Sequence, residues 1–352
     1  MIRSLHSLRF VFAIFIVASH MVGEAFDFGG DCGVSFFFML SGFVLSVGYA
    51  ERMCKGLFNQ RSFCLKQLLK FYPLHIVTLS IMVILDIRLD QELEWYRLLP
   101  SILLLQSWIP KGDFYFVANG PAWFLSDIFF FYIVFHLLFQ RLFRLSLKCL
   151  IRNFVTFGVL YPMFAFTIPS DAINSFLYIF PLTRVIDFAI GILLYRFYVS
   201  AKGGKVRLWL SKQNISIITF MECLMIIGIV ILFYIYRECP VPLRCACLFW
   251  CFLPFFICFF ADTEQCSGFI TKKILQHPIM LWLGSISFEV YMLHAVLIRV
   301  GNSLYSEGVN AGFGIFFIII LISVSWVVKK FFSDKMYLSL VMYINKNECK
   351  NN

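Results

Sequence analysis

Apolar runs of about 20 residues, the length that an α-helix needs to cross a bilayer, recur along this chain and constrain its fold more than any other feature. They extend from Phe10 almost to Lys329 in a chain of 352 residues. Of these residues 61% are hydrophobic and only 14% charged, which excludes a soluble globular domain. No segment alternates apolar and polar residues as a lipid-facing barrel strand does. We therefore expect an all-α polytopic membrane protein.

A sliding window of roughly 20 residues predicts about ten transmembrane helices. The predicted spans lie near residues 8–26, 33–50, 68–86, 122–140, 151–168, 173–195, 214–236, 243–261, 278–299 and 311–328. The first is expected to be a retained helix, because no small-x-small cleavage site follows it. We expect one transmembrane domain over residues 1–335 and a polar cytoplasmic tail over residues 336–352, with no room for a large soluble domain.

The net charge of +10 is distributed unevenly between the predicted loops. Of the 30 Lys and Arg residues, 22 fall on the side that holds both termini and six on the other. Cytoplasmic loops carry such an excess of positive charge, so both termini are predicted to be cytoplasmic. The basic residues are then matched to membrane lipid rather than to nucleic acid. A multi-pass protein of the cell inner (plasma) membrane is expected, and its one long outer loop, residues 87–121, could hold a bulky polar partner.

Few charged side chains lie inside the predicted spans, where each one is costly enough to need a partner or a function. Arg9 and His20 are eleven residues apart, about three helical turns, so they share one face of the first helix roughly 16 Å apart along its axis. Two interpretations are open. Arg9 snorkels to lipid phosphate and His20 is a satisfied interior histidine, or the two line a channel in which Arg9 holds the phosphates of a cytoplasmic carrier and His20 meets its reactive end.

The remaining intramembrane charges are harder to assign. Arg184 and Asp187 have i, i+3 spacing, so they either neutralise each other or belong to the site. Asp127 is expected as a helix cap or interfacial group, and Glu222 as an interfacial residue without a function. His294 shares a helix face with Tyr291 and is equally consistent with a bridging hydrogen bond and with substrate contact.

Several motifs of soluble enzymes are missing from the sequence. It has no glycine-rich phosphate loop, no G-x-S-x-G elbow and no His/Cys/Asp metal cluster. The twelve cysteines lie mostly inside apolar runs and are expected to be packing residues. We therefore expect neither hydrolase nor ATPase chemistry, no metal and no bound cofactor.

Six segments together resemble one known family. Its opening signature of an Arg, ten residues and a His is matched by Arg9 and His20. The second and third segments are residues 33–43 (GVSFFFMLSGF) and residues 66–73 (KQLLKFYP). The later ones are residues 120–126 (GPAWFLS), 184–191 (RVIDFAIG) and 284–294 (GSISFEVYMLH). In this order they resemble the integral-membrane acyltransferase family 3, which adds acetyl or other short acyl groups to cell-surface sugars.

The resemblance implies an O-acyltransferase, most simply an O-acetyltransferase. The acyl group would come from a cytoplasmic acyl-CoA such as acetyl-CoA, used as a co-substrate, and would go to a hydroxyl of an extracytoplasmic polysaccharide or lipid-linked sugar. His20 and Arg9 would be catalytic. The residues expected to bind donor or acceptor are Lys70, Trp123, Arg184, Asp187 and His294.

The sequence departs from the family pattern at two places, and two other functions are open to a chain of this kind. Lys66, Gln67 and Lys70 stand where members usually carry arginines, and the acid often found beyond the Trp motif is out of register, with Ile128 in its place. A surface-polysaccharide transporter or flippase is the main alternative, although its expected matching broken helices are not evident. A polymerase is the other.

Overall fold

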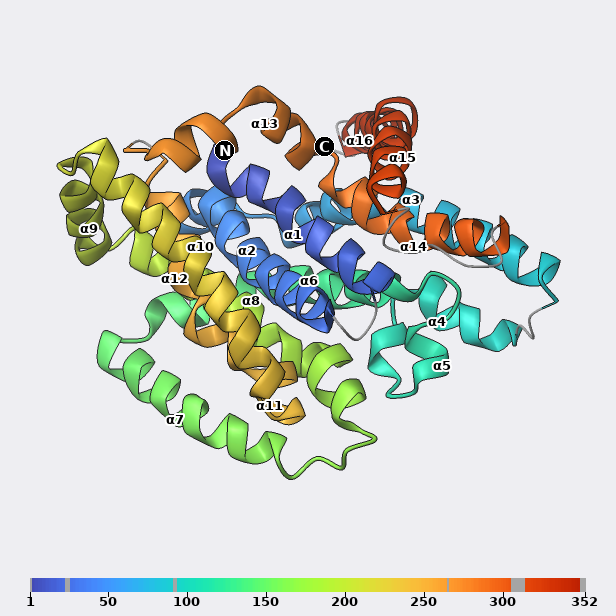
Figure 1. Ribbon diagram of the computed structural model, residues 1–352, viewed down its shortest axis with the longest axis horizontal. Helices are drawn as coiled ribbons and strands as arrows, with labels where there is room; N and C mark the ends of the chain where they lie inside the picture. Colours follow the sequence, from blue (N-terminus) through green and yellow to red (C-terminus); the bar gives the residue numbers. More distant parts are fainter. Residues whose placement is uncertain (1, 23–25, 91–93, 265, 305–313, 349–352) are drawn as a thin grey trace.

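A computed structural model of the chain describes residues 2–22, 26–90, 94–264, 266–304 and 314–348. Within these residues every regular element is a helix, which confirms the predicted all-α class. Figure 1 shows α1 (Arg3–Val22) and α2 (Asp27–Cys54) side by side in the middle of the bundle, with α7 (Leu147–Ala165) at its edge.

The other helices include most of the apolar runs of the sequence, together with the polar helices α9 and α16. The longer ones are α3 (Gln60–Arg88), α6 (Trp123–Arg144), α8 (Pro181–Tyr198), α9 (Ala201–Ser211), α10 (Ile215–Glu238), α12 (Leu253–Asp262), α14 (Ser287–Leu304), α15 (Gly314–Val328) and α16 (Asp334–Glu348). The shorter ones are η2 (Trp95–Arg97), α4 (Leu98–Ile102), η3 (Gln106–Trp108), α5 (Gly112–Tyr115), η4 (Gly120–Ala122), η5 (Asn174–Ile179), α11 (Val241–Ala246), η6 (Leu248–Cys251), η7 (Ile270–Leu275), α13 (Pro278–Ser285) and η9 (Lys329–Ser333).

The described chain has six helices that are long and apolar enough to cross a membrane, or seven if the bent pair α13 and α14 forms one span. Three predicted spans are interrupted. The range 173–195 divides at Phe180, the range 243–261 breaks between α11 and α12, and α13 meets α14 at an angle of 59°. The helices thus indicate a multi-pass membrane protein, whereas the count of ten and the orientation of the termini stay predictions.

Three parts of the predicted boundaries need comment. Residues 23–25, at the end of the first predicted span, and 311–313, at the start of the last, lie outside the described residues, as do residues 349–352 of the predicted tail. The proposed boundary between residues 335 and 336 falls within α16. The beginning of the predicted tail is therefore helical.

Glycines in the family-like segments permit close helix crossings at the centre of the bundle. A Cβ on Gly42 would lie 2.1 Å from the carbonyl oxygen of Phe188, and one on Gly191 would lie 2.0 Å from that of Met39. Helices α2 and α8 therefore touch backbone to backbone, the small-residue packing typical of membrane helices. Two of the resembling motifs thus carry glycines that serve packing.

The segment between α3 and α6 folds over the ends of neighbouring helices instead of standing free. The buried His75 on α3 donates a hydrogen bond through Nε2 to the Ser101 carbonyl, 2.9 Å away. Asn119 donates from Nδ2 to Thr78 Oγ1 at 3.1 Å, and the Tyr291 hydroxyl on α14 donates to the Pro121 carbonyl at 2.6 Å. These buried contacts fix the segment to α3 and α14.

Helix α10 carries one buried carboxylate, that of Glu222, whose contacts in the described residues are structural. Glu222 is fully buried, and its two carboxylate oxygens accept hydrogen bonds from the backbone N–H groups of Gly268, Ile270 and Thr271 at 2.8–3.1 Å. The carboxylate thereby satisfies donors at the start of η7 that no preceding turn can reach. The residue expected at the interface without a function therefore joins α10 to η7.

Candidate active site

Helix α1 is continuous from Arg3 to Val22, so it carries Arg9 and His20 on one face as the spacing predicts. At about 1.5 Å per residue the two side chains are roughly 16 Å apart along the helix axis. Arg9 is half-buried, and His20 is exposed to a cavity that it helps to line. Neither side chain makes a hydrogen bond or an ion pair within the described part of the chain.

A second predicted site residue lies against His20. The imidazole ring of His294, on α14, has its centroid 5.0 Å from that of His20 and is tilted by 35°. His294 is fully buried, and its Nδ1 donates to the carbonyl of Tyr291 one turn earlier. This leaves Nε2 as a buried acceptor with no hydrogen-bond partner among the described residues. The hydrogen bond lies within α14 and bridges no second element, while Nε2 is free beside His20, so a substrate contact of His294 stays a prediction.

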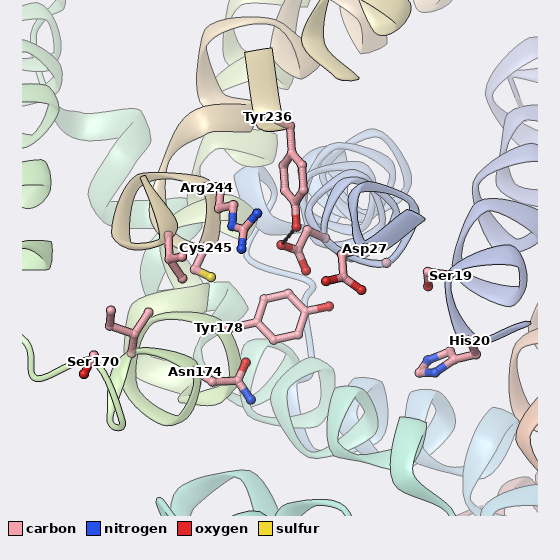
Figure 2. Close-up of a pocket in the computed structure, with 13 residues that line it drawn as sticks. Ser19, His20, Asp27, Ser170, Asn174, Tyr178, Tyr236, Arg244 and Cys245 are labelled. Atoms are coloured by element: carbon pink, nitrogen blue, oxygen red, sulfur yellow. Dashed lines mark hydrogen bonds between the residues drawn. The ribbon is translucent and has the colours of Figure 1, made fainter. Parts of the chain in front are cut away.

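A cavity of about 350 Å³ opens beside His20 (Figure 2). It is lined by Ser19, His20, Asp27, Gly30, Asp31, Ser170, Ile173, Asn174, Tyr178, Tyr236, Val241, Arg244 and Cys245. Figure 2 shows the Tyr178 ring in the middle, with its hydroxyl pointing to the side where Asp27 and His20 lie, and the guanidinium of Arg244 opposite. The lining combines charged groups of both signs with an aromatic ring, as expected of a site for a polar ligand.

Arg184 and Asp187 form the buried ion pair that their spacing allows, with Arg184 NH2 and Asp187 Oδ2 2.9 Å apart. Arg184 also donates to Ser35 Oγ at 3.0 Å and to the Cys245 carbonyl at 3.2 Å, while the indole N–H of Trp250 donates to Asp187. The pair lies behind the Tyr178 ring, whose centroid is 5.6 Å from the Arg184 guanidinium carbon. These contacts favour the structural interpretation, and a role for either residue in the site stays a prediction.

Trp123 and Asp127 lie in the first turns of α6, and both are buried. The Trp123 ring contacts the Tyr178 ring with centroids 5.2 Å apart, so it reaches the cavity only through Tyr178. Asp127 is fully buried, and neither carboxylate oxygen has a hydrogen-bond partner among the described residues. The expectation that it caps the helix is wrong, because α6 begins at Trp123 without a side-chain cap.

The Arg9 end of the site gathers charged groups from three elements. Lys70 on α3 and Glu289 on α14 are each close enough to Arg9 for their charges to interact. Lys70 is exposed and donates to Gln67 Oε1 at 3.0 Å. Glu289 is buried and interacts in turn with Lys329, the first residue of η9. A cation-rich region with unsatisfied donors is suited to a phosphate-bearing ligand.

Comparison with known proteins now assigns the chain. A family model described as "Acyltransferase domain" matches residues 2–330, nearly the whole chain. The chain belongs to acyltransferase family 3. The resemblance found in the six segments is thus confirmed, and the long apolar helices agree with a multi-pass membrane member of this family.

One curated relative supports the assignment. Acyltransferase MdmB of Streptomyces mycarofaciens is 29% identical over 223 residues, an alignment that covers 54% of this chain and 56% of the relative. The chain therefore spans about half the length of this curated relative. No solved structure matched the acyltransferase.

The sequence alone does not identify most of the residues that line the cavity. Asp31 lies just before residue 33, where the predicted second span begins, so it was not counted among intramembrane charges. Arg244 lies at the boundary of a predicted span and is assigned to a loop, and Tyr178 and Tyr236 are two of the 15 tyrosines of the chain. Their position in the sequence carries no signal, because the cavity is formed by segments that meet only in the folded bundle.

Proposed function

We propose that this membrane acyltransferase is an O-acetyltransferase of the cell inner membrane. It takes the acetyl group from cytoplasmic acetyl-CoA and transfers it to a hydroxyl of an extracytoplasmic polysaccharide or lipid-linked sugar. The observation that carries the proposal is that Arg9 and His20 lie on one face of the same helix, and neither makes a hydrogen bond or an ion pair in the described chain. His20 opens onto a cavity lined by polar groups.

In this proposal the chemical step is one acyl transfer with balanced atoms. The oxygen of the acceptor hydroxyl bonds to the thioester carbonyl carbon, its proton passes to a nitrogen of His20, and the carbon–sulfur bond breaks. The departing thiolate then takes this proton from His20, so the products are the ester and CoA, and His20 returns to its neutral form. A histidine suits this proton transfer because its ordinary pKa lies near neutrality. An acyl-histidine intermediate is a second route by which the same residue completes the same transfer.

Arg9 and Lys70 hold the donor in this proposal. The diphosphate of CoA binds their cationic groups, and the long pantetheine chain extends along α1 toward His20. Arginine presents a planar fork of donors that matches phosphate oxygens, whereas lysine acts as a point charge. The approximately 16 Å between Arg9 and His20 along the axis separates donor headgroup from reacting carbon.

Membranes containing the protein should incorporate label from labelled acetyl-CoA into glycan, and membranes without it should not. The Arg9→Lys variant keeps the charge but loses the fork, so we expect the acetyl-CoA concentration for half-maximal rate to rise about tenfold. Arg141→Lys, on an exposed position of α6, is the matched control and should leave it unchanged. An unchanged dependence in both Arg9→Lys and Arg9→Ala would assign Arg9 to lipid contact instead.

A further inference from the structure

The cavity beside His20 holds more hydrogen-bonding capacity than the protein itself uses. Asp27, Arg244 and the Tyr178 hydroxyl line it and make no hydrogen bond within the described residues. Asp31 uses only Oδ2, which accepts from the Tyr236 hydroxyl at 2.8 Å. Because unpaired polar groups in a half-buried site are costly, their concentration around one cavity points to a ligand that satisfies them.

The shape and direction of these groups indicate what that ligand presents. The Tyr178 ring offers a face against which a sugar ring can stack, and the carboxylates of Asp27 and Asp31 accept hydrogen bonds from hydroxyl groups. The Arg244 guanidinium carbon lies 5.0 Å from the Tyr236 ring centroid, which fixes the side chain while its N–H groups remain available. A cavity of about 350 Å³ accommodates one or two sugar rings.

The charges discriminate between classes of sugar. The lining carries two carboxylates against one guanidinium, and no ion pair joins Arg244 to Asp27 or Asp31 in the described structure. A uronic or sialic acid would bring a third negative charge into a half-buried space, where repulsion is stronger than in water. An uncharged sugar avoids this repulsion and still donates hydroxyls to both carboxylates.

We propose that this cavity is the acceptor subsite and that Asp27 and Asp31 select an uncharged sugar over an anionic one. The inference rests on the proposed function for what happens to the bound sugar, but sugar binding itself does not depend on acyl transfer. Asp31, held by Tyr236, orients a hydroxyl of the sugar toward His20. Tyr178 and Arg244 hold the rest of the ring.

The test compares two glycosides that differ only at C6, p-nitrophenyl β-D-glucoside and p-nitrophenyl β-D-glucuronide. Binding of each to the full chain in lipid nanodiscs is measured by saturation-transfer NMR, and acetylation of each is measured with labelled acetyl-CoA. We expect the glucoside to bind about tenfold more tightly, the discrimination that one half-buried charge repulsion gives. In Asp31→Asn and Asp27→Asn/Asp31→Asn this preference should fall toward one, because the amides preserve size and remove the charges.

Matched controls outside the cavity are Asp90→Asn and Arg237→Gln, both at exposed positions, and both should retain the preference. Equal or tighter binding of the glucuronide, no binding of either glycoside, or an unchanged preference in the double variant would each overturn the inference. If the glucoside binds in an Asp31-dependent way and is never acetylated from acetyl-CoA, the subsite stands and the proposed function fails. The two failures are therefore distinguishable.

Discussion

The charged residues behind Tyr178 and those in front of it differ in what surrounds them. Behind the ring, Arg184 and Asp187 pair with each other and with neighbouring groups of three elements. In front of it, His20, Asp27 and Arg244 face a cavity without hydrogen-bond partners in the described chain. Burying an unpaired polar group costs free energy. Behind the ring the protein's own groups offset this cost, whereas in front of it a bound ligand would have to do so. The charged groups that both lack a partner and line the cavity indicate the site. Lack of a partner alone does not, because the buried Asp127 also has none among the described residues.

The largest effect is expected at His20, one of the groups that face the cavity without a hydrogen-bond partner in the described chain. His20→Ala should lower acyl transfer by about 10²–10⁴-fold, the usual contribution of a positioned general base. The amount of folded protein should stay near wild type, because an exposed imidazole contributes little packing. His136→Ala, a half-buried histidine on α6 bonded to Gln140, is the control and should keep its activity. Acyl transfer by His20→Ala at the wild-type rate would contradict the assignment of the site to the unpaired groups around the cavity.

The next largest effect is expected at the ion pair of Arg184 and Asp187. Arg184→Leu and Asp187→Leu should each destabilise the protein by about 3–5 kcal/mol, because each leaves an uncompensated buried charge. The double variant should recover much of this loss, which thermal unfolding in detergent would measure. Activity per folded molecule decides between the two interpretations. Recovery in the double variant marks a structural pair, whereas a folded but inactive double variant places Arg184 in the site.

A smaller effect is expected at Glu222, whose carboxylate satisfies three backbone donors. Glu222→Gln keeps the shape but weakens charge-assisted hydrogen bonds, so we expect a loss of about 1.5–3 kcal/mol in stability. The exposed Glu238→Gln on the same helix should be neutral. Activity per folded molecule should not change in either variant. A selective loss of activity in Glu222→Gln would show that having hydrogen-bond partners in the protein does not distinguish structural from functional charges.

How far the sequence predicted this molecule depends on the separation of the residues involved. Local geometry was predictable: a period of 3.6 residues placed Arg9 and His20 on one face, and i, i+3 spacing allowed the Arg184–Asp187 pair. The contact between the His20 and His294 rings was not predictable, because it depends on how α1 and α14 cross. Hydropathy also failed at breaks such as Phe180, because it does not register Pro181, which lacks an N–H donor and disfavours helical backbone at the residue before it.

The proposed function requires that donor and acceptor meet α1 at opposite ends. Sealed membrane vesicles of defined orientation test it most directly, with labelled acetyl-CoA supplied only from outside. Vesicles with the cytoplasmic face outward should transfer label to acceptor enclosed within them, and His20→Ala vesicles should not. Right-side-out vesicles should remain inactive until they are permeabilised. Transfer by intact right-side-out vesicles from external acetyl-CoA would contradict the claim.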